Sequence, residues 1–194
     1  MTDSRTTLYF VRHAHSPYVP NKEAERGLSE QGRRDASRVA RILTEYDIDV
    51  VVSSPYARAV ETVQETAEAV GTEVIIESGF RERTLAENHV EYFEEAITRV
   101  WSDPSFSWEG GESNEVAQER GIKTVERTLE RWNGKDIVIG THGSILTLIL
   151  NYFDETYDFK FWQQLAMPDV YQVTFEKDRS PQIEGIYSVS RVQL

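Results

Sequence analysis

Residues 8–16 have the sequence LYFVRHAHS, and residues 137–143 have the sequence IVIGTHG. Each stretch begins with a run of apolar residues, which is typical of a strand buried in a sheet. Each run is followed by a histidine, His13 in the first stretch and His142 in the second. Ligands of open α/β sheets bind beyond the carboxyl ends of the strands. We therefore expect these two strands to bring both histidines into one crevice.

Strands and helices alternate in the first part of the chain. We expect strands at residues 6–12, 49–53 and 73–77. Ser29 is a plausible N-cap for a helix that runs to about Tyr46. Ser54 is expected to cap the next helix, with Pro55 in the first helical position and Gly71 at the end. A strand–helix–strand–helix–strand order predicts a parallel sheet.

The second part of the chain departs from this alternation. We expect helices at residues 89–101, 113–132, 144–152 and 159–165, and strands at residues 136–141, 170–175 and 183–189. Residues 80–111 are interpreted as a helical and loop insertion that covers the crevice. The last two strands should form a hairpin-like pair and give the sheet an antiparallel edge. The fold class is α/β, in a single domain that spans residues 1–194.

The composition limits the classes of function. The chain has 194 residues, a formal net charge of −12 and no cysteine. Because nucleic acids and anionic membranes bind basic surfaces, neither is an expected partner. The absence of cysteine removes disulfides, thiolate catalysis and cysteine-ligated zinc. No signal-peptide pattern or membrane-length apolar run is present, so we expect a soluble, cytoplasmic protein of undetermined oligomeric state.

Arg12 ends the first expected strand, and His13 follows it. The simpler interpretation of this pair is a packed histidine beside a surface arginine. A neutral imidazole is also a competent nucleophile near pH 7. Phosphoryl transfer depends mainly on positioning and charge stabilisation, and an arginine fork matches the geometry of a phosphate. Arg58 lies in the first turn of a helix that follows the second strand, where backbone N–H groups attract anions. These residue types favour a phosphate site.

His142 and Glu82 are further candidates for chemistry. His142 precedes Gly143, which would let the backbone approach a ligand closely. The imidazole could donate a hydrogen bond to a phosphoryl oxygen, or could serve only in packing. Glu82 follows the third strand and is flanked by Arg81 and Arg83. It could form a surface ion pair with these arginines, or could donate a proton to a leaving oxygen.

The ordered set of motifs resembles that of the histidine phosphatase superfamily, also called phosphoglycerate mutase-like. The resemblance covers nearly the whole chain. Its motifs here are Arg12-His13-Ala14, Gly27-Leu28-Ser29-Glu30-Gln31-Gly32, Ser53-Ser54-Pro55-Tyr56-Ala57-Arg58, Phe80-Arg81-Glu82, Gly111-Glu112-Ser113 and Thr141-His142-Gly143. Ala14 stands where the family usually has glycine, so we expect the backbone there to avoid angles that only glycine adopts.

The resemblance implies a role for each matched residue. His13 would be the nucleophile that becomes phosphohistidine, and Glu82 would be the general acid and then the base for water. The other site residues that it implies bind the phosphate or the substrate: Arg12, Ser16, Arg58, His142 and Gly143. It also implies a three-layer α/β/α sandwich, a small phosphorylated substrate, and no metal or organic cofactor.

Four functions remain open from the sequence. A phosphomonoester phosphatase is the main hypothesis, and a phosphoglycerate mutase that uses the same phosphohistidine is the first alternative. The insertion is short and acidic, which favours access of water and therefore the phosphatase. A non-catalytic phosphate-ligand binding protein is a third possibility. The pair His13-x-His15 could suit a metal, although no aspartate or glutamate follows closely.

Several aromatic residues and one histidine could line the pocket. The candidates are His15, Tyr18, Tyr92, Phe106 and Trp108. They would suit a substrate with an apolar or aromatic body. The alternative is that the aromatic residues pack the insertion onto the domain.

Overall fold

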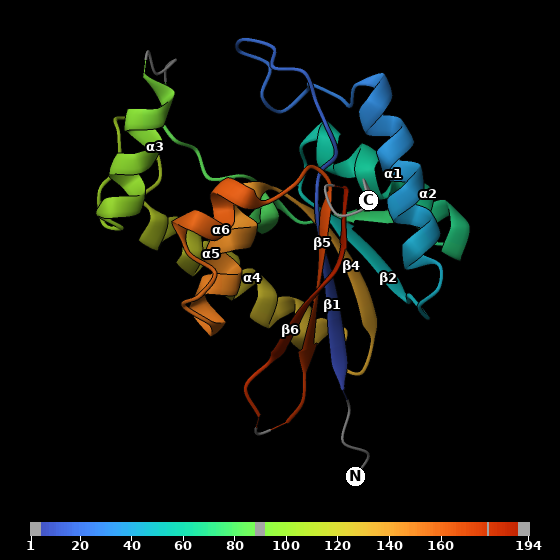
Figure 1. The fold of residues 1–194 in the computed structure, drawn as a ribbon. Helices are drawn as coiled ribbons and strands as arrows, with labels where there is room; N and C mark the ends of the chain where they lie inside the picture. Colours follow the sequence, from blue (N-terminus) through green and yellow to red (C-terminus); the bar gives the residue numbers. More distant parts are fainter. Residues whose placement is uncertain (1–4, 88–91, 178, 190–194) are drawn as a thin grey trace.

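One six-stranded sheet lies at the centre of the computed structural model, which describes residues 5–87, 92–177 and 179–189 (Figure 1). The strands are β1 (Thr6–Arg12), β2 (Val50–Ser53), β3 (Val74–Ile76), β4 (Asp136–Thr141), β5 (Asp169–Phe175) and β6 (Gln182–Ser188). Their order is β3-β2-β4-β1-β5-β6. The first four in this order run parallel, and β5 and β6 are antiparallel to their neighbours. The predicted, mostly parallel sheet with an antiparallel edge is confirmed.

Residues 8–12 and 137–141 lie side by side at the middle of the sheet. β1 pairs with β4 in parallel, and the register joins Arg12 to Thr141. The backbone N–H of His13 continues the ladder by donating to the carbonyl of Thr141 at 3.0 Å. Because the strands are parallel and end in register, the residues that follow them emerge at the same edge of the sheet.

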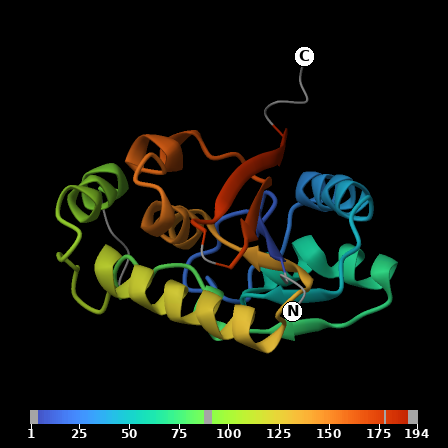
Figure 2. The ribbon, with the colours of Figure 1, turned by 90° about the horizontal axis from the view of Figure 1, so that it is seen from below.

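Helices cover both faces of the sheet, which gives the predicted three layers (Figures 1 and 2). The helices are α1 (Glu30–Leu43), α2 (Ala57–Val70), η1 (Ser78–Phe80), α3 (Phe93–Ser102), α4 (Asn114–Arg131), α5 (Gly143–Phe153) and α6 (Phe159–Gln164). Tyr9 and Val11 of β1 face the core under α1 and α2, whereas Leu8 and Phe10 face the core under α4 and α5. This alternation follows from the two-residue period of a strand. Within the described ranges, no helix combines the length and apolarity that crossing a membrane requires.

The helix caps agree with the sequence at two starts and differ at a third. Ser29 caps α1 by accepting from the N–H of Gly32 at 2.9 Å, and Ser113 caps α4 by accepting from the N–H of Val116 at 3.2 Å. The prediction that Ser54 caps α2 is wrong, since Tyr56 is the N-cap. The Ser54 hydroxyl instead lies 2.7 Å from the His142 ring. The same hydroxyl accepts from the backbone N–H of Tyr56 at 3.3 Å, so it joins the start of α2 to the His142 ring without capping the helix.

The C-terminal ends of α1 and α2 can also be compared with the prediction from the sequence. α1 ends at Leu43, three residues before the predicted end at Tyr46. Gly71 ends α2 in the left-handed conformation, with a φ of 76°, as the sequence predicts. A glycine adopts this φ without the steric cost that a side chain would bring.

The insertion packs against α6 through aromatic rings. The start of its predicted helix at His89 lies outside the described residues, and α3 is described from Phe93. The ring of Trp101 stacks on Phe159 of α6 with 5.6 Å between centroids. Phe106 and Trp108 pack edge to face at 5.0 Å, and the Trp108 indole N–H donates to the carbonyl of Ala96. These two aromatic residues thus tie the loop to α3; that the insertion covers the site stays a prediction.

Candidate active site

His13 lies buried at the end of β1, with 5% of its surface exposed. Its Nδ1 atom is 2.8 Å from the carbonyl oxygen of Ala14. A carbonyl oxygen only accepts hydrogen bonds, so we assign the ring proton to Nδ1. The other nitrogen, Nε2, then carries a free lone pair. The backbone thus fixes the tautomer that a histidine nucleophile requires.

His142 follows β4 and is completely buried. Its ring centroid lies 5.3 Å from that of His13, at an interplanar angle of 62°. Its Nε2 atom is 2.7 Å from the hydroxyl oxygen of Ser54. Its Nδ1 atom has no hydrogen-bond partner among the residues that the structure describes. Because a buried polar atom normally has a partner, this nitrogen is available to a ligand.

Arg58 is the largest buried side chain in the cluster, with 1% of its surface exposed. Its two terminal nitrogens donate to Glu23, one to the backbone carbonyl and one to the carboxylate, each at 2.6 Å. Its Nε atom has no partner within the described part of the chain. Burial lowers the pKa of Arg58, and the Glu23 carboxylate opposes this effect.

Arg12 emerges from β1 on the side of α6. Its Nη1 atom donates to the carbonyls of Leu165 and Ala166 at the end of α6. Burial lowers its pKa, while the charge of Glu82 acts in the opposite direction. A Cβ atom on Gly143 would lie 3.1 Å from the Arg12 guanidinium, which is closer than ordinary contact. The glycine after His142 therefore leaves the space that this guanidinium occupies.

The side chain of Glu82 reaches the N-terminus of α5, the helix that starts directly after His142. Its carboxylate accepts hydrogen bonds from the N–H groups of Arg83 at 2.9 Å, Ile145 at 3.0 Å and Ser144 at 3.1 Å. The first turn of a helix has unpaired N–H groups, and these groups hold the side chain of Glu82 in place. The structure therefore brings Glu82 to the helix that follows His142.

Burial and positive charge act together on the two histidines. Burial lowers the pKa of His13 well below its usual value, and the charges of Arg58 and Arg12 lower it further against the hydrogen bond to Ala14. Burial also lowers the pKa of His142, with the neighbouring His13 and Arg58 as additional causes. Both rings are therefore neutral near pH 7. A neutral His13 keeps its lone pair, and a neutral His142 keeps one proton to donate.

The loop after β1 contributes two residues that the sequence analysis missed. The Glu23 carboxylate lies 2.6 Å from Arg58 and 3.0 Å from Arg26. Arg26 also donates to the hydroxyl of Ser16 at 2.8 Å, and Ser16 donates to the carbonyl of Gly27. Glu23 and Arg26 are spaced as Glu-x-x-Arg in the proline-containing loop directly after His13, and this spacing was the sequence signal that could have identified them. Ser16 thus reaches the cluster through Arg26 rather than by direct contact with His13.

The structure does not bring two of the predicted substrate residues into this cluster. His15 is exposed, and its Nδ1 atom lies 2.8 Å from the Ser29 hydroxyl at the start of α1. Tyr18 has 64% of its surface exposed. Their contact with a substrate stays a prediction. Ala14 fits an ordinary backbone conformation, as expected, because Asn21 is the one non-glycine residue with a positive φ in the described ranges.

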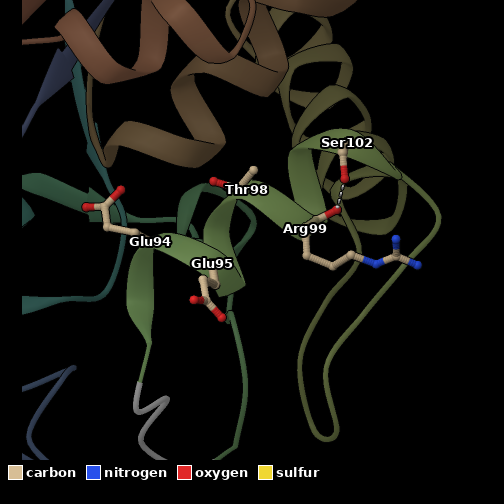
Figure 3. A pocket seen from close by; sticks show the side chains of 5 residues that line it. All are labelled: Glu94, Glu95, Thr98, Arg99 and Ser102. Atoms are coloured by element: carbon tan, nitrogen blue, oxygen red, sulfur yellow. Dashed lines mark hydrogen bonds between the residues drawn. The ribbon is translucent and has the colours of Figure 1, made fainter.

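A separate hollow lies on the outer side of α3 (Figure 3). Its volume is about 460 Å³, and it is lined by Glu94, Glu95, Thr98, Arg99 and Ser102. None of these residues belongs to the histidine cluster. In the part of the chain that is described, no group of three or more histidine, aspartate or glutamate side chains is arranged to hold a metal ion.

Comparison with known proteins identifies the family. The model of the histidine phosphatase superfamily, branch 1, matches residues 8–186. Phosphoserine phosphatase 1 of Hydrogenobacter thermophilus is 31% identical over 147 residues, which cover 70% of each chain. Phosphoglycerate mutase-like protein 4 of Arabidopsis thaliana is 30% identical over 154 residues, which cover 72% of this chain and 67% of the plant protein. The chain therefore belongs to the histidine phosphatase superfamily.

The solved structures agree on the fold. A phosphoserine phosphatase from Entamoeba histolytica, solved in complex with phosphoserine, superposes with a TM-score of 0.77. The two proteins share 18% sequence identity over 93% of this chain and 96% of the other. At this identity the likeness concerns the arrangement of the sheet and helices. It confirms the predicted phosphoglycerate mutase-like fold.

The ion pair between Glu23 and Arg58 would compete with a phosphate bound by Arg58, so its loss should tighten phosphate binding. In Glu23→Gln, an incoming phosphate no longer competes with a carboxylate for the Arg58 guanidinium. The Glu23 side chain is half exposed, so the pair is worth about 1 kcal/mol, or roughly a three- to tenfold tighter binding of inorganic phosphate. Isothermal titration calorimetry measures this change. Glu25→Gln, a neighbouring exposed carboxylate, is the control, and weaker or unchanged binding in Glu23→Gln would contradict the prediction.

Proposed function

We propose that this chain is a phosphomonoester phosphatase that forms a phosphohistidine on Nε2 of His13. The observation that carries the proposal is the hydrogen bond from His13 Nδ1 to the Ala14 carbonyl, which leaves Nε2 without a proton. The lowered pKa of His13 supports the same role, because it keeps the ring neutral. Membership of the family and the phosphatase names of its relatives also support it.

In the first step, the His13 Nε2 lone pair attacks phosphorus and the ester P–O bond breaks. Arg12, Arg58 and His142 stabilise the charge on the three phosphoryl oxygens. Glu82 enters this step in its protonated form and gives its proton to the leaving oxygen. It leaves the step as the carboxylate, which its three N–H donors stabilise.

In the second step, water attacks phosphorus and the P–N bond breaks. Glu82 accepts a proton from this water, and the electron pair of the broken bond returns to His13 Nε2. Phosphate is released with the ring in its original tautomer. Glu82 is then protonated, which is the form that the next substrate needs.

We propose a small phosphorylated metabolite as the substrate. Phosphoserine is the first compound to test, because one relative is named a phosphoserine phosphatase and one structural neighbour was solved with phosphoserine. The negative charge of Glu23 beside Arg58 disfavours substrates with more than one phosphate group. Phosphoglycerate mutase activity is the second candidate, because the Arabidopsis relative is named mutase-like. A cytoplasmic location and independence from metal remain part of the proposal.

Phosphate release tests the proposed activity. With a chelator present, the wild-type protein should release phosphate from phosphoserine or from an aryl phosphate. His13→Ala should lose at least about 10³-fold in kcat, because no other group replaces the nucleophile. Equal release by both proteins would contradict the role of His13. Conversion of 3-phosphoglycerate to its 2-isomer without phosphate release would instead support a mutase.

A pH titration tests the state of His13 directly. The ¹⁵N shifts of the ring should show the proton on Nδ1 at pH 8. Because burial and two arginines lower the pKa, the ring should stay neutral as the pH falls through 6.5 and gain a proton only below that value. The unfolded chain takes up this proton near pH 6.5, so stability should also fall below that pH. A proton on Nε2, or a midpoint at 6.5 or above, would contradict the assignment.

A further inference from the structure

Glu112 forms a dense cluster of hydrogen bonds between the insertion and α4. Its carboxylate accepts from Arg81 at 2.8 Å, from two nitrogens of Arg120 at 2.9 Å each, and from the N–H of Thr84 at 3.2 Å. Burial alone would raise the pKa of Glu112, but these donors lower it below its usual value. Glu112 is therefore a charged group with a fixed position.

Arg120 connects this carboxylate to the backbone just before Glu82. Its Nη1 atom donates to the carbonyls of Gly79 at 2.7 Å and Arg81 at 3.1 Å. The Arg120 guanidinium thus donates to the Glu112 carboxylate along one edge and to the two backbone carbonyls from its remaining nitrogen. A lysine ammonium cannot reproduce this planar arrangement.

The backbone just after Glu82 is held by Glu112 itself. The N–H of Glu112 donates to the carbonyl of Thr84 at 2.7 Å, and its carboxylate accepts from the N–H of Thr84. A Cβ atom on Gly111 would lie 2.2 Å from the carbonyl of Leu85, so the close approach of the two segments requires glycine there. Glu82 consequently lies between two fixed points of the backbone.

The carboxyl end of Glu82 is held from the opposite side. Ser144 and Ile145 of α5 donate to it, and α5 starts directly after His142. We propose that Glu112 and Arg120 are positioning residues that hold Glu82 in line with the leaving oxygen of the substrate. This inference rests on the proposed function, since it assumes that Glu82 is the acid. Neither residue touches the reacting atoms.

The leaving group of the substrate distinguishes positioning of an acid from general support of the fold. An alkyl phosphate such as phosphoserine needs a proton on its leaving oxygen, whereas 4-nitrophenyl phosphate does not. The value of kcat/KM covers only the steps up to departure of this group. A displacement of about 1 Å can cost roughly 10²-fold. Glu112→Gln and Arg120→Met should therefore lower kcat/KM for phosphoserine about 10- to 100-fold and for 4-nitrophenyl phosphate less than about threefold.

Glu119→Gln is the matched control, because Glu119 is an exposed carboxylate on the same helix and pairs with Lys123. It should change neither substrate's kcat/KM. Arg120→Lys keeps the charge without the planar fork and should give an intermediate loss, which preserves the test if Arg120→Met does not fold. In a Glu82→Gln background, Glu112→Gln should cost nothing more, because the group that it positions is already gone.

The outcomes separate this inference from the proposed function. Suppose that Glu82→Gln lowers kcat/KM more for phosphoserine than for 4-nitrophenyl phosphate. An equal loss of kcat/KM on both substrates in Glu112→Gln and Arg120→Lys would then overturn the positioning role. If Glu82→Gln itself loses equally on both substrates, Glu82 is not the acid and the inference fails with that role. A selective loss on phosphoserine that disappears in the Glu82→Gln background supports it.

Discussion

The parallel pairing of β1 with β4 is the constraint on which the site depends. The register that joins Arg12 to Thr141 places His13 and His142 at one edge of the sheet. Their ring centroids lie 5.3 Å apart although 128 residues separate them in the chain. A slip of one residue would turn every side chain of the strand to the other face. The apolar residues of β1 prevent such a slip, because they alternate between two separate cores.

The site combines buried cations with neutral histidines. Arg12 and Arg58 would be costly to bury without partners, and each has them: two carbonyls at the end of α6 for Arg12, and Glu23 for Arg58. Their charges in turn lower the pKa of His13. The same arginines that would bind a phosphate thus help to keep His13, the proposed nucleophile, unprotonated. Glu23 keeps Arg58 paired within the chain, so a phosphate that binds Arg58 would have to displace a carboxylate.

The sequence predicted the sheet and two of the helix caps, because strand ends and helix starts carry local signals. The same signals selected His13, Arg12, Arg58, His142 and Glu82 as candidate site residues, and their roles stay a prediction. It did not predict the bond between Ser54 and His142, since that contact joins residues 88 positions apart. It also missed the pairing of Glu23 with Arg58 across 35 positions. The first contact depends on the pairing of β2 with β4, which joins Ser53 to Gly140, and the second depends on the path of the loop after β1. Neither periodicity nor capping patterns describe that path.

The central claim is that Nε2 of His13 becomes phosphorylated during turnover. Rapid quenching of the wild-type protein with labelled phosphoserine or an aryl phosphate, followed by mass spectrometry under alkaline conditions, measures it most directly. The account predicts a phosphoryl group on His13 that forms within the first turnover, is stable to alkali and is lost in acid. A phosphoryl group on another residue, or phosphate release in a full turnover with no phosphorylated intermediate, would contradict it.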